Sequence, residues 1–220
     1  MTLSRVGGLA ALTCAATYLF GFALLLTLLA PMGYGTTEID TAAVVAFIHA
    51  RPGVLILWNT TIYIANALAL AVLVVALSAK LRPFSVAWAS VAHAIGLIWA
   101  TLVLGAGMIA NVAVEQAGRI YPENPDAAAS LWSVLQSVEL GLGGGNEIAG
   151  AVWILCASVA SMRHRALPVS VSLVGLSTGV GGLATLVPAI GDLAGAVFGL
   201  GAIVWFVLIG GHLVRSTKTT

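Results

Sequence analysis

The stretch VELGLGGGNEIAGAVWIL, residues 138–155, carries two carboxylates, one asparagine and a glycine-rich break inside a long apolar sequence. Glu139 and Glu147 lie on either side of the glycine-rich run 141–145, and Asn146 precedes the second glutamate. A carboxylate within lipid is costly and usually faces a protein interior or a water-filled cavity. The position of this stretch relative to a bilayer therefore bears on both the fold and the candidate site.

The composition is that of an integral membrane protein. Hydrophobic residues make up 60% of the 220 positions and charged residues only 8%, whereas a soluble domain is about 25% charged. Apolar stretches of about 20 residues or more suit a hydrocarbon core of about 30 Å. We predict an all-α fold with one domain, a bundle of six transmembrane helices. The predicted spans are residues 6–30, 54–79, 84–110, 143–162, 169–188 and 193–214.

Basic residues are distributed unevenly between the two sides of this predicted bundle. Seven of the nine Lys and Arg fall on the side of the N-terminus, at Arg5, Lys80, Arg82, Arg163, Arg165, Arg215 and Lys218. Only Arg51 and Arg119 fall on the other side. Because loops rich in Lys and Arg stay in the cytoplasm, we predict that both termini are cytoplasmic.

The connections on the opposite, outer side are long, and each contains a predicted short helix. One helix covers residues 38–50 and the other covers residues 125–140, where Asn124 suits the N-cap and Pro125 the first helical position. We expect both helices to lie on the outer surface. Because the long connections and their helices are all on the outer side, we expect the protein to act from that side.

The glycine-rich run is predicted to separate the second outer helix from the fourth span. A single helix from Ser130 to Ser161 would be about 48 Å long, which is much longer than the hydrocarbon core. Membrane entry near Gly143 leaves Glu139 solvated on the outer helix and sets Glu147 about 6 Å below the outer boundary. Glu147 then either occupies the first turn of its helix, where the dipole favours a negative charge, or lines an outward-facing pocket.

Further polar residues lie at a similar depth. Asn59, Tyr63 and Asn66 follow an i, i+4, i+7 spacing and share a helix face. His93 lies near the bilayer centre on the third span. The pocket hypothesis groups them in one outward-opening cavity lined by Glu147, Asn146, Asn59, Tyr63 and Asn66, with His93 near its floor and Asn111, Glu115 and Asp192 as candidates for the outer rim. The alternative is that the asparagines hydrogen-bond neighbouring helices, and that His93 is a neutral side chain bonded to a carbonyl or to Asn66.

Glycines in the last two spans follow small-residue spacings that allow close helix packing. They are Gly175 and Gly179 in the fifth span, and Gly191, Gly195 and Gly199 in the sixth. We expect these spans to form a tight antiparallel pair. His93 has no histidine partner at matching depth and no ligand at metal-binding spacing, so no cofactor and no metal site is predicted.

The C-terminal half resembles the domain of unknown function 4386 family of bacterial membrane proteins. The similar features are the Glu147 to Trp153 segment, Leu167-Pro168, the glycine-rich fifth span and GLGAIVWFVLIGGHLVRS at 199–216. The resemblance implies a bacterial inner-membrane location, no established activity and no catalytic residues.

The sequence is compatible with three classes of function. The first is an outward-facing polar pocket for a small molecule, ion or lipid, used in transport or sensing. The second is a structural or accessory subunit of a larger membrane complex, and the third is an intramembrane enzyme. The expected partners are the lipid bilayer, a small-molecule or lipid ligand, and a membrane protein or a second copy of the chain. No nucleic-acid partner is expected.

Overall fold

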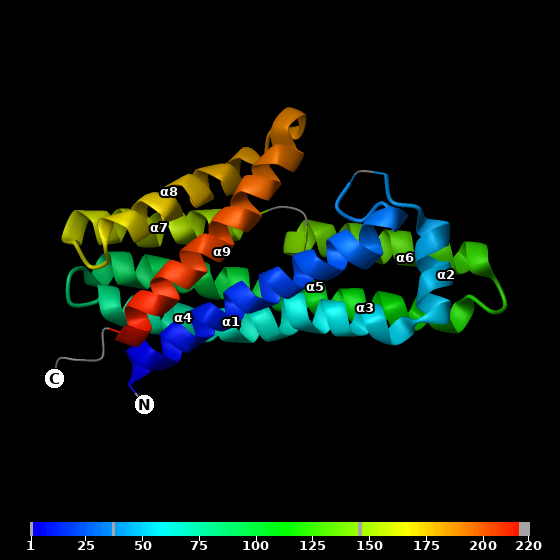
Figure 1. The fold of residues 1–220 in the computed structure, drawn as a ribbon, viewed down its shortest axis with the longest axis horizontal. Coiled ribbons are helices and arrows are strands. Elements are labelled where there is room, and N and C mark those ends of the chain that lie inside the picture. Colours follow the sequence, from blue (N-terminus) through cyan, green and yellow to red (C-terminus); the bar gives the residue numbers. More distant parts are fainter. Residues whose placement is uncertain (1, 37, 145–146, 216–220) are drawn as a thin grey trace.

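The computed structural model describes residues 2–36, 38–144 and 147–215, and every regular element within these ranges is a helix. Most helices run roughly along the long axis of an elongated bundle (Figure 1). In chain order the elements are α1 (Leu3–Leu24), η1 (Leu25–Leu29), η2 (Ala30–Met32), α2 (Thr41–Ala50), α3 (Pro52–Asn59), η3 (Thr60–Ala65), α4 (Asn66–Leu81), α5 (Val86–Ile120), α6 (Pro125–Glu139), η4 (Leu140–Gly144), α7 (Ile148–His164), α8 (Val169–Ala184), η5 (Pro188–Ile190) and α9 (Gly191–Arg215).

Five helical runs in the described ranges are long and apolar enough to cross a membrane, by length and composition. They are Leu3–Met32, Pro52–Leu81, Val86–Ile120, Pro125–His164 and Leu193–Arg215. The predicted fifth span differs, because α8 has 16 residues and ends at Ala184, before Pro188. Proline restricts the residue before it to extended backbone, which favours an early end to the helix. The chain is thus an all-helical protein with several apolar helices, compatible with a membrane protein.

The structure corrects the expected position of α6. The sequence predicted a third span ending at residue 110, but α5 continues to Ile120 and is 35 residues long, or about 52 Å. α6 runs back alongside the C-terminal part of α5 (Figure 1) and does not lie across the surface. Ala128 and Trp132 of α6 are buried in the same cluster as Ala113 and Ala117 of α5. This burial holds α6 alongside α5. α2 does cross the bundle end (Figure 1).

Two hydrophobic clusters hold the helices together. The larger one joins α1, α4, α5, α7, α8 and α9 around aromatic rings that pack at an angle to one another, with Trp153 5.6 Å from Trp99 and 5.3 Å from Trp205 between ring centroids. The smaller one joins α2, α3, α5 and α6 at the other end of the bundle. The cavity described below lies where the two clusters meet, since it is lined by members of both.

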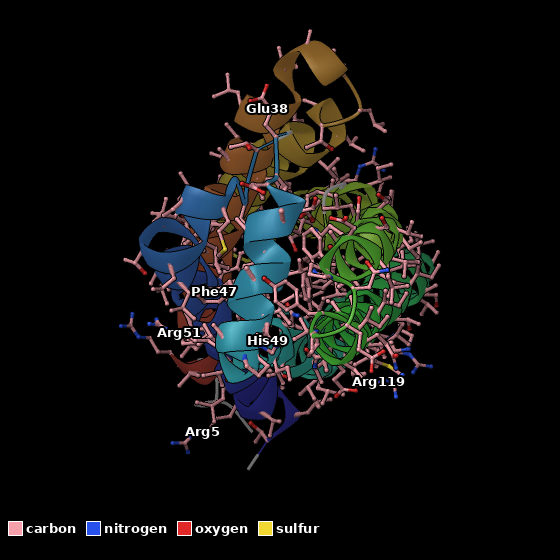
Figure 2. All side chains as sticks on the ribbon, turned by 90° about the vertical axis from the view of Figure 1, so that its right-hand side faces the viewer. Arg5, Glu38, Phe47, His49, Arg51 and Arg119 are labelled. Atoms are coloured by element: carbon pink, nitrogen blue, oxygen red, sulfur yellow. The ribbon has the colours of Figure 1, made fainter. Side chains whose placement is uncertain are left out.

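Basic residues mark both ends of the bundle, with Arg5 near the start of α1 and Arg215 at the end of α9. α1 begins and α9 ends at one end, where the Ser4 hydroxyl donates to the Leu213 carbonyl at 3.0 Å. At the α2 end, Arg51 and Arg119 point outward on opposite sides (Figure 2). Large apolar side chains cover the flanks between the ends, as at Leu26 on η1 and Leu193 on α9, which are 72% and 70% exposed. An apolar band between charged ends suits a protein surrounded by lipid.

Candidate binding cavity

The helical conformation between α6 and α7 is interrupted at Gly143. This residue has φ 138°, a conformation that favours glycine. The sequence predicted a break in this run, and the structure has one, with α7 beginning at Ile148. Glu147 occupies the N-cap position, and its side chain makes no capping hydrogen bond. Its backbone carbonyl does take part in the helix, because it accepts a hydrogen bond from the Ala151 N–H at 2.8 Å.

A cavity of about 520 Å³ lies beside this break. Its walls come from α1, η1, the segment that follows η2, α3, η3, the start of α4, α5, the end of α6 and η4. The residue before α7, the residue after α8 and the start of α9 complete them. Its polar lining consists of Tyr18, Tyr34, Thr36, Asn59, Tyr63, Asn66, Gln136, Glu139, Glu147 and Thr185. The structure thus brings Glu147, Asn59, Tyr63 and Asn66 together at one cavity, whereas Asn146 lies outside the described residues.

Glu139 corrects the expectation of a solvated side chain. It is 1% exposed and lines the cavity. Gln136 donates through Nε2 to Glu139 Oε2 at 2.9 Å, the Tyr63 hydroxyl lies beside the carboxylate, and Oε1 has no partner among the described residues. The physical reason is that α6 packs alongside α5, so that the last turn of α6 faces the interior of the bundle.

Asn59 and Asn66 both line the cavity, but they differ in their side-chain hydrogen bonds. Asn66 is 1% exposed, and its Nδ2 donates to Thr17 Oγ1 at 2.7 Å and to the Cys14 carbonyl at 3.4 Å. It therefore ties α4 to α1, as the helix-bonding alternative expected, while it also lines the cavity. Asn59 is buried and lines the cavity, with no side-chain hydrogen bond recorded among the described residues.

Aromatic rings form much of the cavity wall, and among them only Tyr63 was expected from the spacing of polar residues. Tyr34 lies 5.8 Å from Trp58 and 6.0 Å from Trp132 between ring centroids, and Trp58 lies 6.4 Å from Tyr63. Burial, and then the charge of Glu139, raise the pKa of Tyr34 above its usual range, which keeps this hydroxyl a neutral donor.

A spacing in the sequence could have revealed part of this wall. Trp132, Gln136 and Glu139 follow the same i, i+4, i+7 pattern that identified the face of Asn59, Tyr63 and Asn66.

His93 does not lie at the floor of this cavity, contrary to the expectation. It borders a separate hollow of about 430 Å³ with Ser78, Arg82 and Ser90. The floor of the main cavity on α5 is formed by Trp99 and Val103. His93 precedes Trp99 by six residues, which places it about 9 Å along the axis and about 120° around it. Its α4 neighbours in the separate hollow, Ser78 and Arg82, follow Asn66 by 12 and 16 residues, about 18 and 24 Å along that helix, so His93 does not meet Asn66.

The rim candidates do not form a group around the cavity. Asn111 donates through Nδ2 to Thr60 Oγ1 at 3.0 Å and is not in the lining. Glu115 is exposed on α5 and is not in the lining. The side chain of Asp192 lies outside the described part of the chain.

The packing glycines fall into two groups. On α8, a Cβ at Gly175 would meet Ser158 Oγ, and one at Gly179 would meet Leu155 Cγ, so both glycines permit the close approach of α7. On α9, the expected close contact is absent at Gly195, where a Cβ would meet nothing within 4 Å, and a Cβ at Gly191 would only approach the Thr185 carbonyl oxygen at 3.8 Å. These two glycines face the cavity.

The remaining packing glycine, Gly199, also makes its contact away from α8. A Cβ at this position would meet Phe22 Cζ of α1 at 3.0 Å. Of the α9 glycines, Gly191 and Gly195 therefore line the cavity and Gly199 packs against α1. The close packing of α8 against α9 depends on other residues. One of these is Gly201, where a Cβ would meet the Thr178 side chain.

The described residues contain no group of three or more His, Cys, Asp or Glu side chains that could hold a metal ion. Comparisons of the chain with protein-family models, with curated proteins and with solved structures found no match.

Proposed function

We propose that the chain is a six-span protein of a bacterial inner membrane, with both termini in the cytoplasm and the 33–52 and 115–140 segments outside. The basic residues flanking the spans support this orientation. An even number of spans brings both ends of the chain to one side, which agrees with the contact between Ser4 and Leu213. In this proposal α8 is the short fifth span, and the resemblance to the domain of unknown function 4386 family supports the bacterial location.

We further propose that the outer half of the bundle binds a small molecule, ion or lipid for transport or sensing. One observation carries this proposal: the cavity is lined by two carboxylates, those of Glu139 and Glu147. Burying such groups costs free energy unless they have partners. Here Glu139 Oε1 has no partner among the described residues, and none of these residues donates a hydrogen bond to the Glu147 carboxylate. Such an arrangement is typical of a binding site.

The alternative of a structural or accessory subunit predicts a filled interior. A cavity of about 520 Å³ is within the range of about 300–1,000 Å³ common for small-molecule sites, and it favours binding over packing alone. An intramembrane enzyme has no specific support from the arrangement of the lining residues.

Cysteine labelling tests whether the cavity is open to the outside. In a variant without native cysteines, Asn59→Cys is treated in spheroplasts with a membrane-impermeant thiol reagent. The matched control is Leu55→Cys on the same helix, because Leu55 is 1% exposed and is not in the cavity lining. We expect labelling of the cysteine at position 59 and none at position 55. Equal absence of labelling at both positions would contradict an outward-open cavity.

A further inference from the structure

The charges of the cavity lining are all of one sign. Glu139 and Glu147 contribute carboxylates, and no Lys, Arg or His occurs among the described lining residues. The other titratable groups that face the cavity are the hydroxyls of Tyr18, Tyr34 and Tyr63. The N-terminus of α7 adds only about half a positive charge, which the full charge of one ionised carboxylate outweighs. The cavity therefore attracts a cation and repels an anion.

The apolar part of the lining is suited to a particular kind of cation. Three tryptophans, Trp58, Trp99 and Trp132, line the cavity together with three of the four tyrosines of the chain. Aromatic faces attract ammonium groups, with tryptophan the strongest. A small inorganic ion needs oxygen ligands around it and gains less from these rings. Aromatic rings together with carboxylates favour an ammonium group attached to an apolar body.

One lining group also has an unused hydrogen-bonding position. Glu139 is 1% exposed, Gln136 donates to Oε2, the Tyr63 hydroxyl lies beside the carboxylate, and Oε1 is buried without a hydrogen-bond partner among the described residues. A buried acceptor of this kind is uncommon in a folded protein. An N–H group of an ammonium ion would satisfy it with a charge-assisted hydrogen bond.

We propose that the cavity binds an organic cation, an amine with an apolar body, through Glu139, Glu147 and the aromatic wall. This inference rests on the proposed binding function and specifies the class of ligand. Glu139 forms the hydrogen bond, Glu147 supplies the second negative charge, and the rings contact the apolar body.

The test compares three probes that share one phenyl-alkyl body: 4-phenylbutylammonium, neutral 4-phenylbutanol and anionic 4-phenylbutyrate. Each is titrated into the purified full chain in lipid nanodiscs and followed by calorimetry and by tryptophan fluorescence. We expect the ammonium to bind at least about tenfold more tightly than either of the others. Glu139→Gln and Glu147→Gln should each weaken ammonium binding by about tenfold or more. Glu115→Gln is the matched control, because Glu115 is an exposed glutamate outside the lining, and it should leave binding unchanged.

The outcomes separate this inference from the proposed function. Equal binding of the alcohol and the ammonium would overturn the cation inference and leave a binding cavity in place. Displacement of the ammonium by equal concentrations of Na⁺ or Ca²⁺ would overturn the organic class. Absence of binding by all three probes, with Asn59→Cys still labelled, would also reject the inference. Failure of the proposed function is recognised separately, by the absence of labelling at position 59. Unchanged melting temperatures show that the glutamine variants are folded.

Discussion

Two glycines of the α8–α9 hairpin provide a matched test of the packing described above. A Cβ at Gly179 would meet Leu155 Cγ and would lie 2.9 Å from the Ala151 carbonyl oxygen. The Leu155 side chain can move, but the backbone oxygen of α7 cannot move without shifting the helix. At Gly195, in contrast, a Cβ would meet nothing within 4 Å. We therefore expect Gly195→Ala to raise the stability of the protein and Gly179→Ala to be less stable than Gly195→Ala.

The magnitude follows from two opposing terms. Replacing glycine by alanine inside a helix favours the helix by about 1 kcal/mol, and this gain applies to both variants. Overpacking costs about 1–3 kcal/mol and applies only to Gly179→Ala. The difference between the two variants is thus about 1–3 kcal/mol, which corresponds to about 2–12 °C in melting temperature for a chain of this size.

The assay is thermal unfolding of each purified variant in one detergent, followed by intrinsic fluorescence and by the loss of the monodisperse peak in gel filtration. The comparison uses the difference between the two variants, so that the detergent affects both equally. If Gly179→Ala and Gly195→Ala melt at the same temperature, the close contact between α8 and α7 is wrong.

Three further predictions concern the membrane orientation, the hydrogen bond of Asn66 and the cavity carboxylates. A cysteine at position Asn124 should react with an impermeant reagent in spheroplasts, and one at Ser216 should not; the reverse pattern would refute the orientation. Asn66→Ala should cost about 0.6–1.7 kcal/mol in unfolding free energy, and adding Thr17→Val should cost little more, because one hydrogen bond joins the two side chains; additive losses would contradict that bond. The affinity for 4-phenylbutylammonium should rise with pH, because protons compete with the cation for the cavity carboxylates. This pH dependence should disappear when both carboxylates are replaced by glutamine.

The helices themselves could be predicted from the sequence, because apolar length and capping residues are local properties. Asn124, for example, accepts at Oδ1 from the Ala127 N–H at 3.0 Å, in the N-cap role expected for it. The direction of α6 could not be predicted in this way. Glu139 was expected in water, yet both Gln136 and Glu139 line the cavity, while Val134 on another face is 62% exposed. In a membrane protein a polar helix face can border an internal cavity, so polarity alone does not identify the solvent side.

His93 shows a second limit of the same kind. Its depth follows from counting residues along a helix, since each residue adds a fixed rise. Its direction around the helix depends on which face of α5 packs against the other helices. The buried stripe that includes Trp99, Val103 and Ala106 sets that face, and His93 is half-buried at the edge of this stripe. Asn59, Tyr63 and Asn66 share one stripe by spacing, and all three line the cavity.

The break at Gly143 explains how two distant carboxylates reach one cavity. On a continuous helix, Glu139 and Glu147 would be separated by eight residues, which is about 12 Å along the axis and about 80° around it. The backbone at Gly143, with φ 138°, frees the two helices from this fixed relation. The end of α6 and the start of α7 can then approach the cavity independently, and both glutamates line it. The glycine-rich run therefore shortens a helix that is too long for the hydrocarbon core, and it also brings these two carboxylates to a single cavity.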